Sequence, residues 1–335
     1  MPPSSELDLH PGPILVTGAA GFIGSHVAEH LLLAGATVVG LDHLAPPHAD
    51  RLKPARLARL SKHPLFTFHQ RDLTDAAAVQ TLFDSERFPY VIHLAAQASV
   101  RRSLDAPRTF GESNLMGFLE ILEGCQRVGT RHLVYASSSS VYGADTTAPF
   151  TETAEATHPL SLYAATKRAG ELMAHAYAHL HDLAVTGLRF FTVYGPWGRP
   201  DMAYFIFTKA LFDDAPITLF NQGRIWRDFT YIDDVVDVVC RLLPRPARST
   251  SPARLINVGH GKPTPIHRVV ATLEHTTGCT TTPIRAPLPP GDLVRTEADT
   301  TNLDLILGAR RFTPLEEGLA RFVDWYRDFY GIRDR

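Results

Sequence analysis

The sequence predicts an α/β protein with a doubly wound parallel sheet and a second, smaller α/β lobe. Short apolar runs alternate with segments long enough to form crossover helices, a pattern typical of parallel sheets. A glycine-rich turn directly follows the first apolar run, as in sheets that bind nucleotides. The chain has 335 residues, which exceeds the size at which a single core usually divides, so we expect two lobes.

Six apolar runs are the expected strands of the sheet. They are short, and the residues between them suffice for a helix, so consecutive strands are expected to run parallel. The expected strands are Ile14–Val16, Thr37–Leu41, Leu65–His69, Tyr90–Leu94, His132–Ala136 and Ala184–Phe190. Near the other end of the chain, apolar residues at helical spacing predict an amphipathic closing helix between Thr313 and Tyr330.

Composition and charge exclude several classes of partner. The chain has 33 basic and 35 acidic residues and a formal charge of -2, so no global field would attract nucleic acid or an anionic membrane. The longest apolar stretch, His30–Leu41, is too short to cross a bilayer. Residues 1–8 lack the basic start and apolar run of a secretory signal. We therefore expect a cytoplasmic protein that binds neither nucleic acid nor a membrane.

Cysteines and histidines give no sign of a metal site. Cys125, Cys240 and Cys279 are far apart and form no Cys-x-x-Cys pair. His175 and His179 have the spacing of a metal pair, but no third ligand of metalloprotease type accompanies them. We expect no bound metal.

The turn after the first strand is the first candidate binding element. Its glycines allow a sharp turn, close approach of a diphosphate and tight packing of the next helix. The diphosphate would lie at the helix N-terminus, where free N–H groups and the helix dipole favour negative charge. The spacing departs by one residue from Gly-x-Gly-x-x-Gly. The residues expected to contact the cofactor are Gly18, Gly21, Phe22, Ile23 and Gly24.

An acidic residue at the end of the second strand indicates which dinucleotide binds. Asp42 is placed to accept hydrogen bonds from ribose hydroxyls, and its carboxylate would repel a 2′-phosphate. We therefore expect NAD rather than NADP.

The ends of the third and fourth strands should line the same site, since ligands bind at the carboxyl ends of strands in such sheets. Asp72 is suited to accept from the adenine amino group, but it could equally cap the following helix, with Thr74 and Asp75 as competing caps. The residues expected to line the site here are Asp72, Leu73, Leu94, Ala95 and Ala96.

Two further patterns indicate catalysis. Four consecutive serines, Ser137 to Ser140, follow the fifth strand, and each hydroxyl there must find a hydrogen-bond partner. At least one is expected to face a ligand. Tyr163 and Lys167 are four residues apart, which places them on one face of a helix, where an ammonium can lower the pKa of a phenol and make it a base.

With these motifs the chain resembles the extended short-chain dehydrogenase/reductase family, from the glycine turn to the C-terminus. The resemblance implies a Rossmann sheet. It also implies that Ser138 polarises a substrate hydroxyl, that Tyr163 is the catalytic base, and that Lys167 lowers the tyrosine pKa and binds the nicotinamide ribose. Removing a hydroxyl proton as hydride leaves the same carbon is how an alcohol is oxidised on NAD.

Within that family the second half is most similar to UDP-glucuronate 4-epimerases. The similar segments are residues 188–203, Arg227–Asp234 and Pro290–Thr296. The resemblance implies that Arg227 and Arg295 hold the nucleotide diphosphate, which suits two guanidinium groups. It places Thr192, Arg199 and Arg101 around the hexuronic acid, with Arg199 as the first choice for its carboxylate. Each of these arginines could instead form a surface ion pair.

Ser139 and Ser140 separate this chain from related activities. Relatives that eliminate water carry acidic residues after the catalytic hydroxyl, and decarboxylating relatives carry a glutamate at the position of Ser140. The resemblance therefore implies redox-neutral 4-epimerisation of UDP-glucuronate to UDP-galacturonate through a transient 4-ketone, with Thr192, Arg199 and the serines restraining the carboxylate. A UDP-glucose 4-epimerase, a UDP-glucuronate decarboxylase and a non-catalytic NAD-sensing regulator remain alternatives.

The same resemblance implies a domain division and an assembly. Residues 1–187, with about 232–259, would form the NAD-binding Rossmann domain. Residues 188–231 and 260–335 would form the sugar-nucleotide-binding lobe. Two long helices are expected at about 106–128 and 160–181, and their pairing across a two-fold axis would give a homodimer.

Overall fold

The computed structural model describes residues 9–44, 51–144, 146–247, 250–289 and 291–333. Residues 1–8, on which the expectation about a secretory signal rests, lie outside the described residues, as does Pro290 in one of the similar segments.

A seven-stranded parallel sheet forms the larger lobe. Its strand order is β10-β6-β5-β4-β1-β2-β3, which is the doubly wound arrangement that the sequence predicts. All six expected strands are present, and β5 runs two residues further than expected, to Ser138. The strands are β1 (Ile14–Thr17), β2 (Val38–Asp42), β3 (Phe66–Gln70), β4 (Tyr90–His93), β5 (His132–Ser138), β6 (Val185–Phe190) and β10 (Ala253–Val258).

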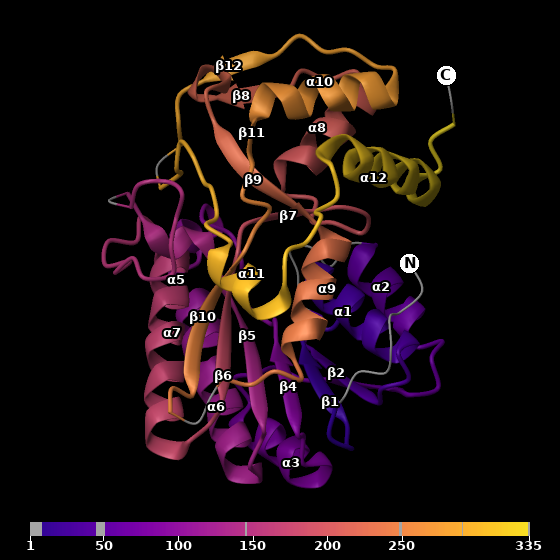
Figure 1. The fold of residues 1–335 in the computed structure, drawn as a ribbon. Coiled ribbons are helices and arrows are strands. Elements are labelled where there is room, and N and C mark those ends of the chain that lie inside the picture. Colours follow the sequence, from indigo (N-terminus) through magenta and orange to yellow (C-terminus); the bar gives the residue numbers. More distant parts are fainter. Residues whose placement is uncertain (1–8, 45–50, 145, 248–249, 290, 334–335) are drawn as a thin grey trace.

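Helices cover both faces of this sheet (Figure 1). On one face α1 packs against α2 and α9, and on the other α3, α6 and α7 pack side by side. The helices are α1 (Phe22–Leu33), α2 (Leu52–Leu60), α3 (Ala76–Glu86), α6 (Gly117–Val128), α7 (Leu162–His181) and α9 (Ile232–Leu242). The sheet is thus buried on both faces, which explains why its strands are continuous apolar runs.

The smaller lobe lies beyond the carboxyl ends of the strands (Figure 1). It contains a three-stranded sheet of order β11-β9-β7 and a parallel pair of β8 and β12. Its helices include the predicted closing helix, α12. The elements are β7 (Thr192–Tyr194), β8 (Thr218–Phe220), β9 (Trp226–Tyr231), β11 (Pro263–Pro265), β12 (Ile284–Ala286), α8 (Ala203–Phe212), α10 (Ile266–Thr277) and α12 (Leu315–Tyr330). The helix α11 (Thr301–Leu307) packs instead against β10 and α9 of the larger lobe.

The helix expected at about 106–128 is interrupted. A π-helical segment, Glu112–Met116, separates α5 (Pro107–Gly111) from α6, and the short helix α4 (Arg102–Asp105) precedes them. Single π-helical turns inside helices are frequent at functional sites. This one carries Asn114, which is 5% exposed.

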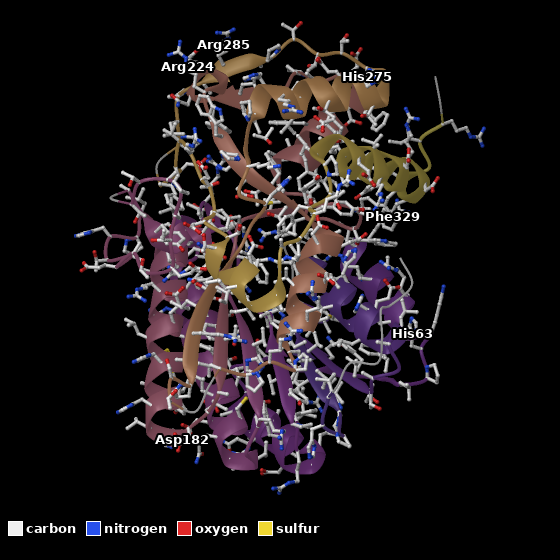
Figure 2. All side chains as sticks on the ribbon, viewed as in Figure 1. His63, Asp182, Arg224, His275, Arg285 and Phe329 are labelled. Atoms are coloured by element: carbon white, nitrogen blue, oxygen red, sulfur yellow. The ribbon has the colours of Figure 1, made fainter. Side chains whose placement is uncertain are left out.

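Charged side chains mark the two outer ends of the molecule. Figure 2 shows Arg224 and Arg285 at the outer end of the smaller lobe and Asp182 at the far end of α7. Within the described ranges, no helix is long and apolar enough to span a membrane.

Candidate active site

A cleft runs along the carboxyl edge of the large sheet and brings together most of the predicted site residues. It is lined by the glycine turn, by the residues that follow β2, β3, β4 and β5, and by the first two turns of α7. The predicted residues that line it are Gly18, Gly21, Phe22, Ile23, Gly24, Asp42, Asp72, Leu73, Leu94, Ala95, Ala96, Ser138, Tyr163, Lys167 and Arg199.

The glycine turn has the shape that a bound diphosphate requires. Gly18 has a φ of +69°, and a Cβ added there would lie 2.8 Å from the Ala95 nitrogen. A Cβ on Gly24 would lie 2.1 Å from the Gly18 carbonyl oxygen, so α1 could not pack this closely with any other residue. Gly21 precedes the first residue of α1 and has no side chain to cap it. The start of this helix therefore lines the cleft without a capping side chain, as an anion-binding helix start does.

Asp42 ends β2 as a buried, ionised carboxylate. It accepts hydrogen bonds from the Ala20 nitrogen (3.2 Å), the Leu44 nitrogen (2.9 Å) and Lys53 Nζ (2.9 Å). Burial acts to raise the pKa of Asp42, but His43 and Lys53 outweigh it and hold the pKa at about 2. The carboxylate suits ribose hydroxyls and opposes a 2′-phosphate. Lys53 was missed in the sequence, because its approach to Asp42 depends on how α2 packs.

The cap of α3 is Asp75, not Asp72. The Asp75 side chain accepts from the Ala78 nitrogen at 3.1 Å. Asp72 accepts instead from the nitrogen and hydroxyl of Thr74, at 2.9 and 2.8 Å, and stays beside the cleft. Of the two interpretations of Asp72, helix capping is therefore wrong, and its contact with adenine stays a prediction.

Tyr163 and Lys167 occupy the first two turns of α7. This helix begins where the Ser161 hydroxyl accepts from the Ala164 nitrogen, at 3.2 Å. Lys167 is 7% exposed, and its Nζ donates to the Ala136 carbonyl at 3.0 Å. Burial lowers the pKa of Lys167 to about 8, and the charge of Glu171 partly opposes this.

The electrostatics of Tyr163 differ from the expectation. Burial raises the pKa of Tyr163, whereas a hydrogen bond with Ser138 and the charge of Arg199 lower it. The sequence did not assign this effect to Arg199. The effect of Lys167 on the pKa of Tyr163 stays a prediction.

The serine run divides between structure and cleft. Ser137 lines the cleft, but its hydroxyl is used inside the protein, where it donates to Glu171 Oε1 at 2.6 Å. Ser138 accepts from the Ser140 nitrogen at 3.2 Å and, of the three serines at positions 138–140, is the one that lines the cleft. Ser139 and Ser140 begin a 3-10 turn, Ser139–Tyr142. Ser138 is the hydroxyl of the run that lowers the pKa of Tyr163.

Arg199 lies in the cleft but already has protein partners. Its Nε and Nη2 bind the two oxygens of Asp201, at 3.0 and 2.6 Å, and Nη2 also donates to the Ala98 carbonyl. Asp201 raises the pKa of Arg199 although burial opposes this, so the guanidinium is charged. A substrate carboxylate at this position would share Arg199 with Asp201.

The remaining predicted residues lie outside the cleft lining. Arg227 pairs with Asp292 (2.7 Å) and Arg295 with Glu297 (2.8 Å), while a β-bridge between Trp226 and Arg295 holds their two segments together. The predicted residues that do not line the cleft are Arg101, Ser139, Ser140, Thr192, Arg227 and Arg295.

The neighbouring side chains of Arg101 and Arg102 lie in different parts of the structure. The Arg101 guanidinium lies over the Phe220 ring, 4.7 Å from its centroid. Arg102, which the sequence did not single out, lines the cleft. Two neighbours on a short helix are about 100° apart in direction, and the sequence does not reveal which one faces inward.

The sequence also did not single out Asn114. Its amide exchanges two hydrogen bonds with the backbone of Gln97, at 2.8 and 3.0 Å, and donates to Thr166 Oγ1 at 3.0 Å. Gln97 lines the cleft, and Thr166 precedes Lys167. The π-helical segment thus fastens one wall of the cleft to α7.

Comparison with known proteins places the chain in a family. Residues 14–259 match the model of the NAD dependent epimerase/dehydratase family. The chain is 42% identical over 331 residues to a probable UDP-glucuronate 4-epimerase of Rhizobium meliloti, covering 94% of this chain and 97% of that one. It is 43% identical to UDP-glucuronate 4-epimerase 4 of Arabidopsis thaliana, covering 95% and 76%.

A solved structure resembles the whole fold. The UDP-glucuronic acid 4-epimerase of Bacillus cereus, in complex with UDP-glucuronic acid and NAD, superposes with a TM-score of 0.88 at 33% identity, covering 95% of this chain and 100% of that one. The match in sequence and that in structure agree. This chain belongs to the NAD dependent epimerase/dehydratase family.

Proposed function

We propose that this protein is a UDP-glucuronate 4-epimerase, which interconverts UDP-glucuronate and UDP-galacturonate through a transient 4-ketone. The observation that carries the proposal is one continuous cleft with a diphosphate-binding turn at one end and Ser138, Tyr163 and Arg199 at the other. The similarity to UDP-glucuronate 4-epimerases over almost the whole chain supports it.

The cleft fits NAD. Gly18 and Gly24 leave no side chain between the sheet edge and the start of α1, and Asp42 supplies an ionised acceptor for ribose hydroxyls. When bound, NAD supplies the group that removes the hydrogen from C4 and returns it to the other face of the sugar. Asp72, Leu73, Leu94, Ala95 and Ala96 would line the rest of its site.

Tyr163 is assigned as the base that takes the proton of the C4 hydroxyl. Ser138 and Arg199 favour the phenolate that accepts this proton, since both lower the pKa of Tyr163 against the effect of burial. Ser138 would also hydrogen-bond the sugar oxygen, and Lys167 would hold the nicotinamide ribose.

The carboxylate must be restrained while C4 is a ketone. A β-keto carboxylate loses carbon dioxide when the breaking bond aligns with the carbonyl π system. Arg199, with Thr192, Ser139 and Ser140, would hold the carboxylate out of that alignment. Arg101 would contact the same sugar, and Arg227 and Arg295 would hold the diphosphate of UDP.

Three further assignments remain predictions. The first is the division into an NAD-binding domain, 1–187 with about 232–259, and a sugar-nucleotide lobe, 188–231 and 260–335. The second is a homodimer formed through the α6 and α7 region. The third is a cytoplasmic location.

One experiment tests the function directly. The purified protein is incubated with UDP-glucuronate without added NAD, and the product is identified by NMR. UDP-galacturonate supports the proposal. A UDP-pentose, or turnover of UDP-glucose alone, would assign the protein to a related activity. Binding of NAD with no turnover of either UDP-sugar would favour the alternative of a non-catalytic NAD-sensing regulator.

A further inference from the structure

One buried guanidinium joins the two ends of the cleft. Arg56, on α2, is 2% exposed. Its Nη1 donates to the Ala20 carbonyl at 3.2 Å. On its other side Nε donates to the Trp197 carbonyl at 3.1 Å and Nη2 to the Gly198 carbonyl at 2.9 Å. Because these acceptors are main-chain oxygens, Arg56 fixes the positions of two backbone segments.

The two segments belong to the two halves of the site. Ala20 is part of the glycine turn that would hold the NAD diphosphate. Trp197 and Gly198 immediately precede Arg199, the group assigned to the sugar carboxylate. The hydrogen bonds of Arg56 therefore connect the cofactor end of the cleft with the substrate end.

The Trp197 turn depends on this support. Trp197 has a φ of +60°, in the left-handed region that residues other than glycine rarely adopt. A Cβ on Gly198 would lie 1.9 Å from the Tyr204 hydroxyl, so the turn is tightly enclosed there as well. A strained turn persists only where its surroundings hold it, and the guanidinium of Arg56 holds both of its carbonyls.

Two neighbouring cations on α2 contact the same two ends of the cleft. Lys53, three residues before Arg56, binds Asp42 at the cofactor end. Arg59, three residues after it, lies over the Trp197 ring at 4.6 Å. Spacing by three places these side chains along one side of α2. At the N-cap of α2, Arg51 lies over the Phe329 ring of α12, 5.3 Å from its centroid.

We infer that Arg56 is a positioning residue that couples NAD binding to the placement of Arg199, so that bound UDP-glucuronate slows NAD release. The inference rests on the proposed function. A shift of the glycine turn as NAD leaves must stretch or break bonds that also hold the 197–198 turn. A sugar nucleotide that fixes Arg199 therefore opposes NAD release, and the linkage is reciprocal. Such coupling keeps the cofactor in place while the 4-ketone exists.

The test measures NAD release from the holoprotein. A Tyr163→Phe background prevents turnover, and NAD loss after dilution is followed with and without saturating UDP-glucuronate. With Arg56 present, UDP-glucuronate is expected to slow release by about 5-fold or more. Arg56→Met should give equal rates, and Arg56→Lys, which keeps the charge but has one nitrogen, an intermediate ratio. Arg51→Met removes the cation at the N-cap of the same helix and should preserve the full ratio.

The outcomes separate coupling from simple contact. If Arg56 only touched NAD, Arg56→Met would speed release by the same factor in both conditions, and the unchanged ratio would overturn the inference. A second result overturns the coupling but not the proposed function: the wild type forms UDP-galacturonate, while UDP-glucuronate leaves the rate of NAD release from the Tyr163→Phe variant unchanged. If the wild type neither binds nor converts UDP-glucuronate, the proposed function fails and the coupling with it. Should Arg56→Met not fold, the ratio for Arg56→Lys decides.

Discussion

Glu171 of α7 and Arg189 of β6 form a buried, bidentate ion pair next to the assigned catalytic residues. Arg189 Nε and Nη2 each lie 2.8 Å from a different oxygen of Glu171. The side chains are 3% and 1% exposed. Glu171 also accepts from the Ser137 hydroxyl, so one carboxylate fastens β5, β6 and α7 together. Lys167 is one helical turn away on α7.

Breaking this pair should destabilise the protein strongly. Glu171→Ala leaves a buried guanidinium without its counter-charge, which costs about 3–5 kcal/mol in comparable cases. The free energy of unfolding, measured by urea denaturation, should fall by that amount. Arg268→Ala breaks the Arg268–Glu316 pair, whose side chains are 60% and 50% exposed, and should cost less than about 1 kcal/mol. Equal costs for the two variants would mean that the buried pair contributes little.

Two buried histidines should make the protein sensitive to acid. Burial lowers the pKa of His93 to about 3 and that of His132 to about 4, from the usual 6.5. Between these values and pH 6.5 the unfolded chain binds more protons than the folded one. The free energy of unfolding should therefore fall as the pH drops from about 6.5 to 4, by up to about 1.4 kcal/mol per pH unit for each histidine.

The variant His132→Gln isolates the contribution of one histidine to this pH dependence. His132→Gln should be less stable at pH 7, since His132 bonds to the Leu243 carbonyl and the Thr186 hydroxyl. Its stability should nevertheless fall less steeply with acid, by about 1 kcal/mol per pH unit. An unchanged slope for His132→Gln would contradict the assignment. Denaturant titrations at several pH values measure it.

The sequence predicted the fold because its signals there are local. Apolar runs, crossover lengths and the glycine turn each act over a few residues, and all six expected strands are present. The place of Asp42 in the cleft was predictable for the same reason, because it follows from the position of Asp42 at the end of β2. The π-helical segment was not predicted, and it spans only the five residues Glu112–Met116.

What the sequence could not predict depends on packing across the chain. Arg56 meets Ala20 and Trp197 only because α2 lies between the glycine turn and the smaller lobe. Arg102 lines the cleft where the sequence predicted Arg101, and this difference depends on the direction of one short helix. Likewise, the motifs placed Arg199 correctly in the cleft, but they did not reveal its pair with Asp201, which follows from the fold of that loop.

Cofactor choice should depend on Asp42. Asp42→Ser removes the charge that opposes a 2′-phosphate and leaves Lys53, now 2.9 Å from the carboxylate, without that partner. NAD should bind about 10-fold or more weakly through loss of a charged acceptor, and NADP should gain affinity. Adding Lys53→Met should remove the gain for NADP while NAD binding changes little further. Calorimetric titration of both cofactors measures this, and an Asp42→Ser variant that still rejects NADP would refute it.

Arg199 should determine what becomes of the 4-ketone. Without its guanidinium the sugar ring can change its pucker until the C5–C6 bond lies perpendicular to the plane of the C4 carbonyl. Carbon dioxide then leaves, the electrons of the C5–C6 bond form an enolate with the C4 carbonyl, and C5 takes up a proton. Arg199→Ala should therefore lower the rate of 4-epimerisation by about 10-fold or more, as expected for a charged hydrogen bond to substrate, and raise the share of pentose products in the NMR spectrum. Arg199→Lys keeps the charge and should be less affected. Arg224→Ala, at the outer end of the same lobe in Figure 2, should behave as wild type. Unchanged product and rate in Arg199→Ala would show that other groups restrain the carboxylate.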